Sequence, residues 1–198
     1  MTTSAILQEP GTQKRSSAKK RLVSLQSFLA HYANKEDRYK YEWNQGVIEK
    51  TLRSMNRDQS IIQAALMAFF YSNPNFLTLG GLIVELDMYI PQVDRTRRAD
   101  LAFLTKQQME DSTKGDFSVA PFVIEVISTN DKFSEAETKL NEYFDAGVQV
   151  VWQVIPVTET VKVYTSPKNV TICSDSDICS AAPVLADFQI PAHQVFGK

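Results

Sequence analysis

Residues 122–127, Phe-Val-Ile-Glu-Val-Ile, constrain the fold most, because this run is apolar apart from one carboxylate. A short run without polar alternation is typical of a strand buried on both faces. Residues 148–155 form a second run of the same kind, which ends at Pro156. Between them, residues 134–147 carry apolar side chains at helical spacing, capping-box residues at Ser134 and Glu137, and a glycine stop. This strand–helix–strand unit predicts a sheet covered by helices.

The remaining periodicities predict further strands and helices around this unit. Helices are expected over 24–33, from Asn56 to about 73, and within 105–118; strands are expected over 82–90 and 98–104; hairpins are expected over 39–52 and 160–173; a short strand and helix are expected over 184–196. Alternation along 82–90 places Leu82, Val84, Leu86, Met88 and Ile90 on one face and Glu85, Asp87 and Tyr89 on the other. We predict an α/β (α+β) fold with a mixed central β-sheet flanked by helices and an N-terminal β-hairpin.

The distribution of charge divides the chain into two parts. Residues 1–21 contain five basic side chains and one acidic one, a net charge of +4, whereas the remaining residues contain 16 basic and 22 acidic side chains, a net charge of −6. We expect a flexible basic tail over 1–21 and one domain over 22–198. The sequence has no apolar signal core and no apolar run long enough to cross a membrane, and its two cysteines make no disulfide framework. These features predict a cytoplasmic protein outside the membrane.

Two carboxylates interrupt strands that are otherwise apolar. Asp100 lies within Arg-Ala-Asp-Leu-Ala-Phe, and Glu125 lies in the middle of the 122–127 run. A carboxylate on a buried strand is costly unless it is paired or binds a cation. The two could share a hard cation such as Mg²⁺. Alternatively, each could pair with an arginine such as Arg97 or Arg98.

An ordered set of motifs around these carboxylates resembles the Uma family of restriction-endonuclease-like proteins, within the PD-(D/E)XK nuclease superfamily. The motifs are Arg98–Phe103, Phe122–Ser128, Lys139–Val148 and Val151–Trp152, with Tyr41-Glu42-Trp43, Gly46 and Ile48 in the early hairpin. The resemblance spans about residues 22–196. It implies a restriction-endonuclease-like core in which Asp100 and Glu125 bind Mg²⁺ or Mn²⁺, with the backbone carbonyl of Val126 as a third protein ligand.

The sequence departs from the superfamily pattern at the lysine two positions after the second acid, where Ile127 stands. Some superfamily members supply this charge from the following helix. Lys139 is our candidate, to orient the attacking water and stabilise the developing negative charge, and Lys132 is its rival. A solvated Lys139 paired with Glu135 or Tyr143 is the alternative.

Other polar residues are weaker candidates. Glu85 is retained as a metal-binding or supporting residue, whereas Glu42 more simply pairs across a ladder. The cluster of Arg95, Arg97 and Arg98, together with the basic tail, could contact a phosphate backbone.

The resemblance implies a Mg²⁺-dependent endonuclease that hydrolyses phosphodiester bonds through Asp100, Glu125 and Lys139. Nucleic acid, in the first instance DNA, is the expected partner, and a homodimer is expected because a duplex has two strands to cut. The alternative is a nuclease fold without useful catalysis, which serves in nucleic-acid binding or protein interaction. The absent lysine at position 127 and the acidic domain motivate that alternative.

Overall fold

The computed structural model describes residues 22–52, 57–112, 119–129 and 131–198. The expected basic tail, the Asn56 cap and the chain between 113 and 118 lie outside these residues. The helices are α1 Leu25–Phe28, continued by a π-helical segment Leu29–Ala33, α2 Arg57–Ser72, α3 Pro74–Leu79, α4 Lys106–Ser112, α5 Phe133–Asp145 and α6 Ala192–Val195. The strands are β1 Tyr39–Asn44, β2 Val47–Leu52, β3 Gly80–Ile90, β4 Arg95–Thr105, β5 Phe122–Val126, β6 Val150–Ile155, β7 Thr160–Ser166, β8 Asn169–Cys173, β9 Ile178–Ala181 and β10 Leu185–Pro191.

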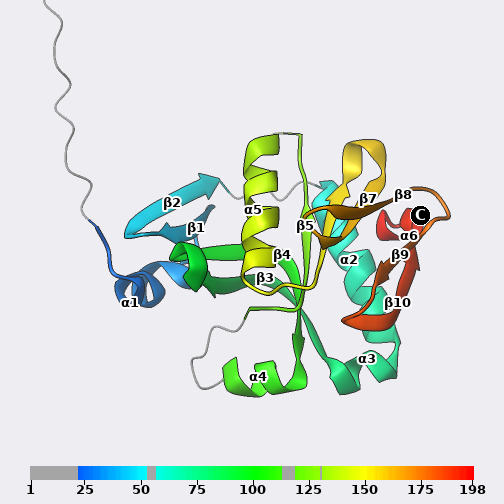
Figure 1. Cartoon of the computed structure of the whole chain (residues 1–198), viewed down its shortest axis with the longest axis horizontal. Coiled ribbons are helices and arrows are strands. Elements are labelled where there is room, and N and C mark those ends of the chain that lie inside the picture. Colours follow the sequence, from blue (N-terminus) through cyan, green and yellow to red (C-terminus); the bar gives the residue numbers. More distant parts are fainter. Residues whose placement is uncertain (1–21, 53–56, 113–118, 130) are drawn as a thin grey trace, which may run out of the picture.

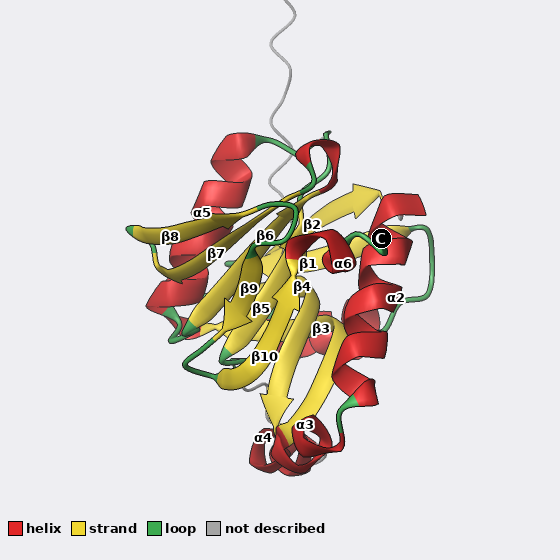
Figure 2. Ribbon diagram, turned by 90° about the vertical axis from the view of Figure 1, so that its right-hand side faces the viewer, coloured by secondary structure: helices red, strands yellow, loops and turns green. Residues whose placement is uncertain are grey.

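A mixed eight-stranded sheet forms the middle layer and confirms the predicted fold class. The sheet follows the order β2-β1-β4-β5-β6-β7-β8, and β3 pairs with β4. The β5–α5–β6 unit, which the sequence predicts as strand–helix–strand, has parallel strands, whereas the other neighbouring strands are antiparallel. Helix α5 covers one face of the sheet and α2 covers the other (Figures 1 and 2).

Two apolar clusters fill the spaces between the layers. On the α2 side, Ile62, Leu66 and Phe70 pack with Trp152 and with Phe188 of β10. On the α5 side, a second cluster contains Met88, Val123, Val151, Leu140 and Tyr143. Side chains on neighbouring positions of β5 and β6 alternate between these clusters, which explains why both strands are apolar along their whole length.

The face expected for β3 is wrong over half of its length. Leu82 packs in the α2-side cluster, but Met88 and Ile90 pack in the α5-side cluster. The reversal occurs at Glu85, whose φ of 51° lies in the left-handed region. A non-glycine residue rarely adopts this conformation, and such residues concentrate at functional sites. Simple alternation could not predict the reversal because it assumes extended backbone throughout.

The ends of the helices differ in detail from the sequence expectations. Helix α5 begins after Lys132 without a side-chain cap, so Ser134 lies inside the helix and the predicted capping box does not form. A short helix, α3, follows α2 because Pro74 takes the first helical position after the capping residue Asn73. Strand β9, which was not expected, pairs with β10 in a separate two-stranded sheet. No helix among the described residues is long and apolar enough to cross a membrane.

The arrangement of strands along β4 opens a gap within the sheet. Strand β3 occupies one edge of β4 from Arg95 to Thr105, so β5 and β1 must share the other edge. Strand β5 pairs only with Leu101–Phe103, and β1 pairs only with Arg95. Asp100 therefore lies just beyond the last β4–β5 pair, in the gap between β5 and the hairpin.

Candidate active site

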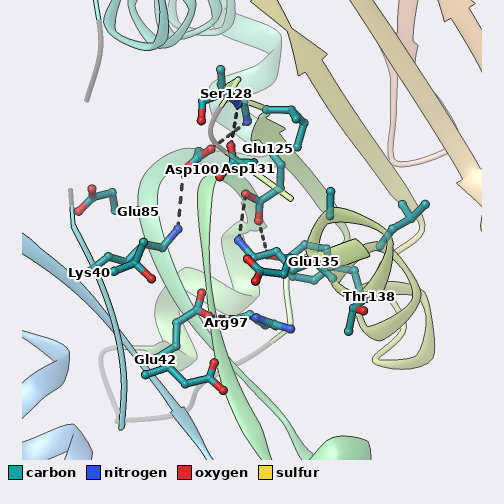
Figure 3. A pocket seen from close by; sticks show the side chains of 18 of the residues that line it. Lys40, Glu42, Glu85, Arg97, Asp100, Glu125, Ser128, Asp131, Glu135 and Thr138 are labelled. Carbon is teal, nitrogen blue, oxygen red and sulfur yellow. Dashed lines mark hydrogen bonds and ion pairs between the residues drawn. The ribbon is translucent and has the colours of Figure 1, made fainter. Parts of the chain in front are cut away.

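A cleft of about 740 Å³ opens at this gap (Figure 3). Its walls come from the β1–β2 hairpin, the middle of β4, the end of β5, the first turns of α5 and β6. Asp100, Glu125 and Lys139, which the sequence predicts as a catalytic set, all line it. The fold thus brings together residues from three separate elements at one end of the β5 strand.

Asp100 is held through one of its two carboxylate oxygens. Oδ2 accepts a hydrogen bond of 2.8 Å from the backbone N–H of Val126, where β4 and β5 have separated. The other oxygen, Oδ1, lies 3.7 Å from the ammonium of Lys40 on β1. Neither Arg97 nor Arg98 forms an ion pair with Asp100, so the arginine alternative is wrong for this residue. Burial and the neighbouring charge of Glu125 raise the pKa of Asp100 to about 6.

Glu125 is held in the same manner. Its Oε1 accepts a hydrogen bond of 2.5 Å from the hydroxyl of Tyr143 on α5. Its Oε2 lies 3.6 Å from the ammonium of Lys139, one turn earlier on the same helix. Each carboxylate therefore has one oxygen fixed by a neutral donor, while the other oxygen faces a lysine.

Lys139 points into the cleft, unlike its rival. Burial by itself lowers the pKa of this lysine, but the charges of Glu125, Glu42 and Asp100 outweigh burial and hold the pKa above its ordinary value. Lys132 instead pairs with Glu135 at the exposed start of α5, with 76% of its side chain accessible. The solvated Lys139 of the alternative interpretation, paired with Glu135 or Tyr143, is not what the structure shows.

The arginines beside Asp100 are structural. Arg95 and Arg97 both bind the carboxylate of Glu142 on α5, and Arg98 binds Asp87 on β3. All three guanidinium side chains are at most 11% exposed. The expectation that they form a basic patch for phosphates is therefore wrong, because all three are largely buried and already paired with carboxylates.

Glu42 and Glu85 both line the cleft but have different surroundings. Glu42 accepts hydrogen bonds from the Arg97 side chain and from the Arg98 backbone, so it pairs with the neighbouring strand β4. Burial alone raises the pKa of Glu42, but Lys139, Lys40 and Arg97 lower it to about 2. Glu85 lies opposite Asp100 across the β3–β4 ladder, between the pairs Val84–Leu101 and Leu86–Ala99.

The donor set fits a hard divalent cation, although three acidic side chains do not converge. Among the described residues, no group of three or more His, Cys, Asp or Glu side chains could hold a metal ion. Two carboxylate oxygens, Asp100 Oδ1 and Glu125 Oε2, nevertheless face cations and accept no hydrogen bond from a neutral donor within the part of the chain that the structure describes. The N–H and C=O of one strand residue point to the same edge, so the Val126 carbonyl is directed toward the Asp100 side. Oxygen donors of this kind are those that Mg²⁺ and Mn²⁺ prefer.

Two residues of the cleft, Gln153 and Lys40, are not among those expected from the sequence. Gln153 on β6 pairs in register with Glu125 and is only 5% exposed. It interrupts an apolar strand as Glu125 does, so the same signal could have found it. Lys40 carried no such signal, because only the pairing of β1 with the distant β4 brings it to Asp100.

The comparisons with known proteins identify the family and agree with the fold. A model of the Uma2 family, described as "Putative restriction endonuclease", matches residues 25–193. A similar solved structure is that of "a putative nuclease belonging to DUF820" from Anabaena variabilis, with a TM-score of 0.70 and 16% sequence identity. That likeness covers 88% of this chain and 98% of the other, and at this identity it shows the fold alone. No curated protein matches the sequence. With the family model covering most of its length, the chain belongs to the Uma2 family of restriction-endonuclease-like proteins.

Proposed function

We propose that the protein is a Mg²⁺-dependent endonuclease that hydrolyses phosphodiester bonds of DNA at the Asp100–Glu125 cleft. The observation that carries the proposal is the shared arrangement of the two carboxylates, each fixed through one oxygen with the other facing a cation. Metal ligands are commonly oriented by such supporting hydrogen bonds. Membership of the Uma2 family, with its description "Putative restriction endonuclease", supports the same reaction class.

The residues of the cleft would have separate roles in metal binding, in positioning and in stabilising charge. Asp100, Glu125 and the Val126 carbonyl would hold the ion, which supplies Lewis-acid charge to the phosphate and to the attacking water when bound. Val126 N–H and Tyr143 keep the two carboxylates in place without neutralising them. Lys139 would donate hydrogen bonds to the water and stabilise the negative charge that develops on the phosphate oxygens. It thus takes the role left vacant by Ile127.

Cleavage of supercoiled plasmid in Mg²⁺ or Mn²⁺ tests this function. Asp100→Asn and Glu125→Gln are expected to abolish cleavage, and Lys139→Met is expected to reduce it on the order of 10²-fold because a charge is removed from the transition state. Lys132→Met is the matched control, since it removes a lysine at the residue that precedes the same helix but lies outside the cleft. Cleavage that survives the Asp100→Asn, Glu125→Gln double variant would refute the site.

The same assay tests the non-catalytic alternative. A wild-type protein that binds Mn²⁺ and DNA but leaves every DNA and RNA substrate intact would be a nuclease-fold binding module. We also propose a homodimer, because two clefts are needed to cut both strands of a duplex in one encounter. Light scattering at the expected mass of a dimer would support this, and a monomer would contradict it.

A further inference from the structure

Lys40 lies on the face of the hairpin that lines the cleft. Alternation along β1 directs Tyr41 and Trp43 into a cluster with Phe28 of α1, so Lys40 and Glu42 face the opposite way. The Lys40 side chain is 19% exposed and its ammonium lies 3.7 Å from Asp100 Oδ1 (Figure 3). It is thus a nearly buried lysine whose partner is a proposed metal ligand.

Lys40 and Lys139 occupy equivalent positions on opposite sides of the cleft. One comes from the hairpin and faces the unfixed oxygen of Asp100, and the other comes from α5 and faces the unfixed oxygen of Glu125. Two carboxylates and two ammonium groups sum to zero charge. A divalent ion between the carboxylates would add two positive charges to these four groups, which makes the cleft less repulsive to a polyanion.

We propose that Lys40 exchanges partners, pairing with Asp100 in the metal-free protein and with a backbone phosphate oxygen of nucleic acid once a divalent ion takes its place. The inference deepens the proposed function and rests on it. A cation bound to Asp100 repels the ammonium, and the flexible four-carbon stem of lysine lets the ammonium move while its base stays fixed on β1. The phosphate then replaces the lost carboxylate partner.

This exchange has a signature that a merely structural ion pair lacks, since removing Lys40 changes two affinities in opposite directions. Lys40→Met should tighten Mn²⁺ binding roughly fivefold, the scale of a partly exposed ion pair, because the competing cation is gone. The same variant should weaken binding of a short DNA duplex in Ca²⁺. It should also reduce the slope of log affinity against log salt by about one, because one phosphate contact is lost.

Isothermal titration with Mn²⁺ alone and fluorescence anisotropy with a labelled duplex measure these effects on the full chain. Lys40→Arg should restore the salt slope, and Lys132→Met should change neither affinity. Lys40→Gln, which keeps a polar stem, serves as the second variant should Lys40→Met unfold. Unchanged Mn²⁺ affinity or an unchanged salt slope in Lys40→Met and Lys40→Gln would overturn the proposal.

The Lys40 measurements can fail or succeed independently of the cleavage assay that tests the proposed function. If the wild-type protein cuts DNA but the Lys40 variants keep the wild-type Mn²⁺ affinity and salt slope, only the proposed exchange of partners is refuted. A wild-type protein that never cuts, with tighter Mn²⁺ binding and a reduced salt slope in Lys40→Met, defeats the nuclease proposal and supports the exchange.

Discussion

At the scale of single residues, the cleft holds one carboxylate whose environment opposes stability in the absence of metal. This residue is Asp100, because burial and the charge of Glu125 raise its pKa from 3.8 to about 6. The folded protein therefore holds this proton more tightly than the unfolded chain does. The resulting penalty grows as pH rises from about 4 to 6 and is complete above pH 6.

We expect Asp100→Asn to stabilise the metal-free protein above pH 6. A shift of this size corresponds to up to ~3 kcal/mol in the free energy of unfolding, and the gain should fade as pH falls toward 4. Urea denaturation in EDTA at pH 8 and at pH 4.5 measures the difference. Asp187→Asn, at an exposed position on β10, is the control. An equal effect of Asp100→Asn at both pH values would contradict the account.

Tyr143 is expected to act on metal binding through Glu125. Tyr143→Phe keeps the buried ring but removes the hydroxyl that fixes Glu125 Oε1. Loss of such a supporting hydrogen bond typically weakens metal affinity ~10-fold or more. Titration with Mn²⁺ checks this, with Tyr71→Phe on α2 as the control for loss of a hydroxyl elsewhere. Equal Mn²⁺ affinities of wild type and Tyr143→Phe would rule out the proposed role.

The candidate catalytic residues could be predicted from the sequence, whereas most of their neighbours in the cleft could not. Asp100 and Glu125 could be found because a carboxylate in an apolar strand is costly, and Lys139 came from a resemblance. Their roles in catalysis stay predictions. Lys40 depends on the long-range approach of β1 to β4, and the partners of the arginines depend on α5; neither follows from local pattern.

At the scale of elements, an ion network joins α5 to the sheet. Glu142 accepts from Arg95 at 3.1 Å and from Arg97 at 2.6 Å, and Arg97 continues to Glu42 on the hairpin. Glu142 lies one turn beyond Lys139, so the network fixes the register of the helix that carries the lysine. Buried pairs of this kind are costly to break because a charge is left without its partner.

Glu142→Gln is therefore expected to destabilise the fold by about 3 kcal/mol or more. Glu135→Gln on the same helix removes an ion pair whose side chains are 76% and 67% exposed, and it should cost below about 1 kcal/mol. Chemical denaturation of both variants at pH 7 makes the comparison. Similar small effects would mean that the network does not hold α5 in place.

Helices and strands could be predicted from the sequence wherever one pattern of apolar residues continued without interruption. Strand β5, helix α5 and strand β6 follow from apolar runs and helical spacing. The prediction failed at Glu85, where one left-handed residue moves the second half of β3 to the other face. It also missed β9, because only its pairing with β10 defines that strand.

At the scale of the whole molecule, the gap in the sheet and the balance of charge act together. Because β5 and β1 share one edge of β4, the sheet leaves polar side chains exposed to a cleft at its centre. The chain outside residues 1–21 has a net charge of −6, which disfavours metal-free binding to nucleic acid. A divalent ion held by Asp100 and Glu125 would add two positive charges to the cleft and so reduce this repulsion.

Divalent metal should accordingly stabilise the folded protein. Ligand at 100 times its dissociation constant adds ~2.7 kcal/mol to the free energy of unfolding. Thermal unfolding with increasing Mn²⁺ should show a rising midpoint for wild type and a flat one for Glu125→Gln. A parallel rise in both proteins would place the ion elsewhere.

The central claim is that Asp100 and Glu125 bind one divalent ion through their unfixed oxygens. Anomalous diffraction from crystals grown with Mn²⁺ tests it most directly. The account predicts one anomalous peak within bonding distance of Asp100 Oδ1, Glu125 Oε2 and the Val126 carbonyl, with the Lys40 ammonium displaced from Asp100. A cleft without an anomalous peak, with both lysines still on their carboxylates, would contradict it.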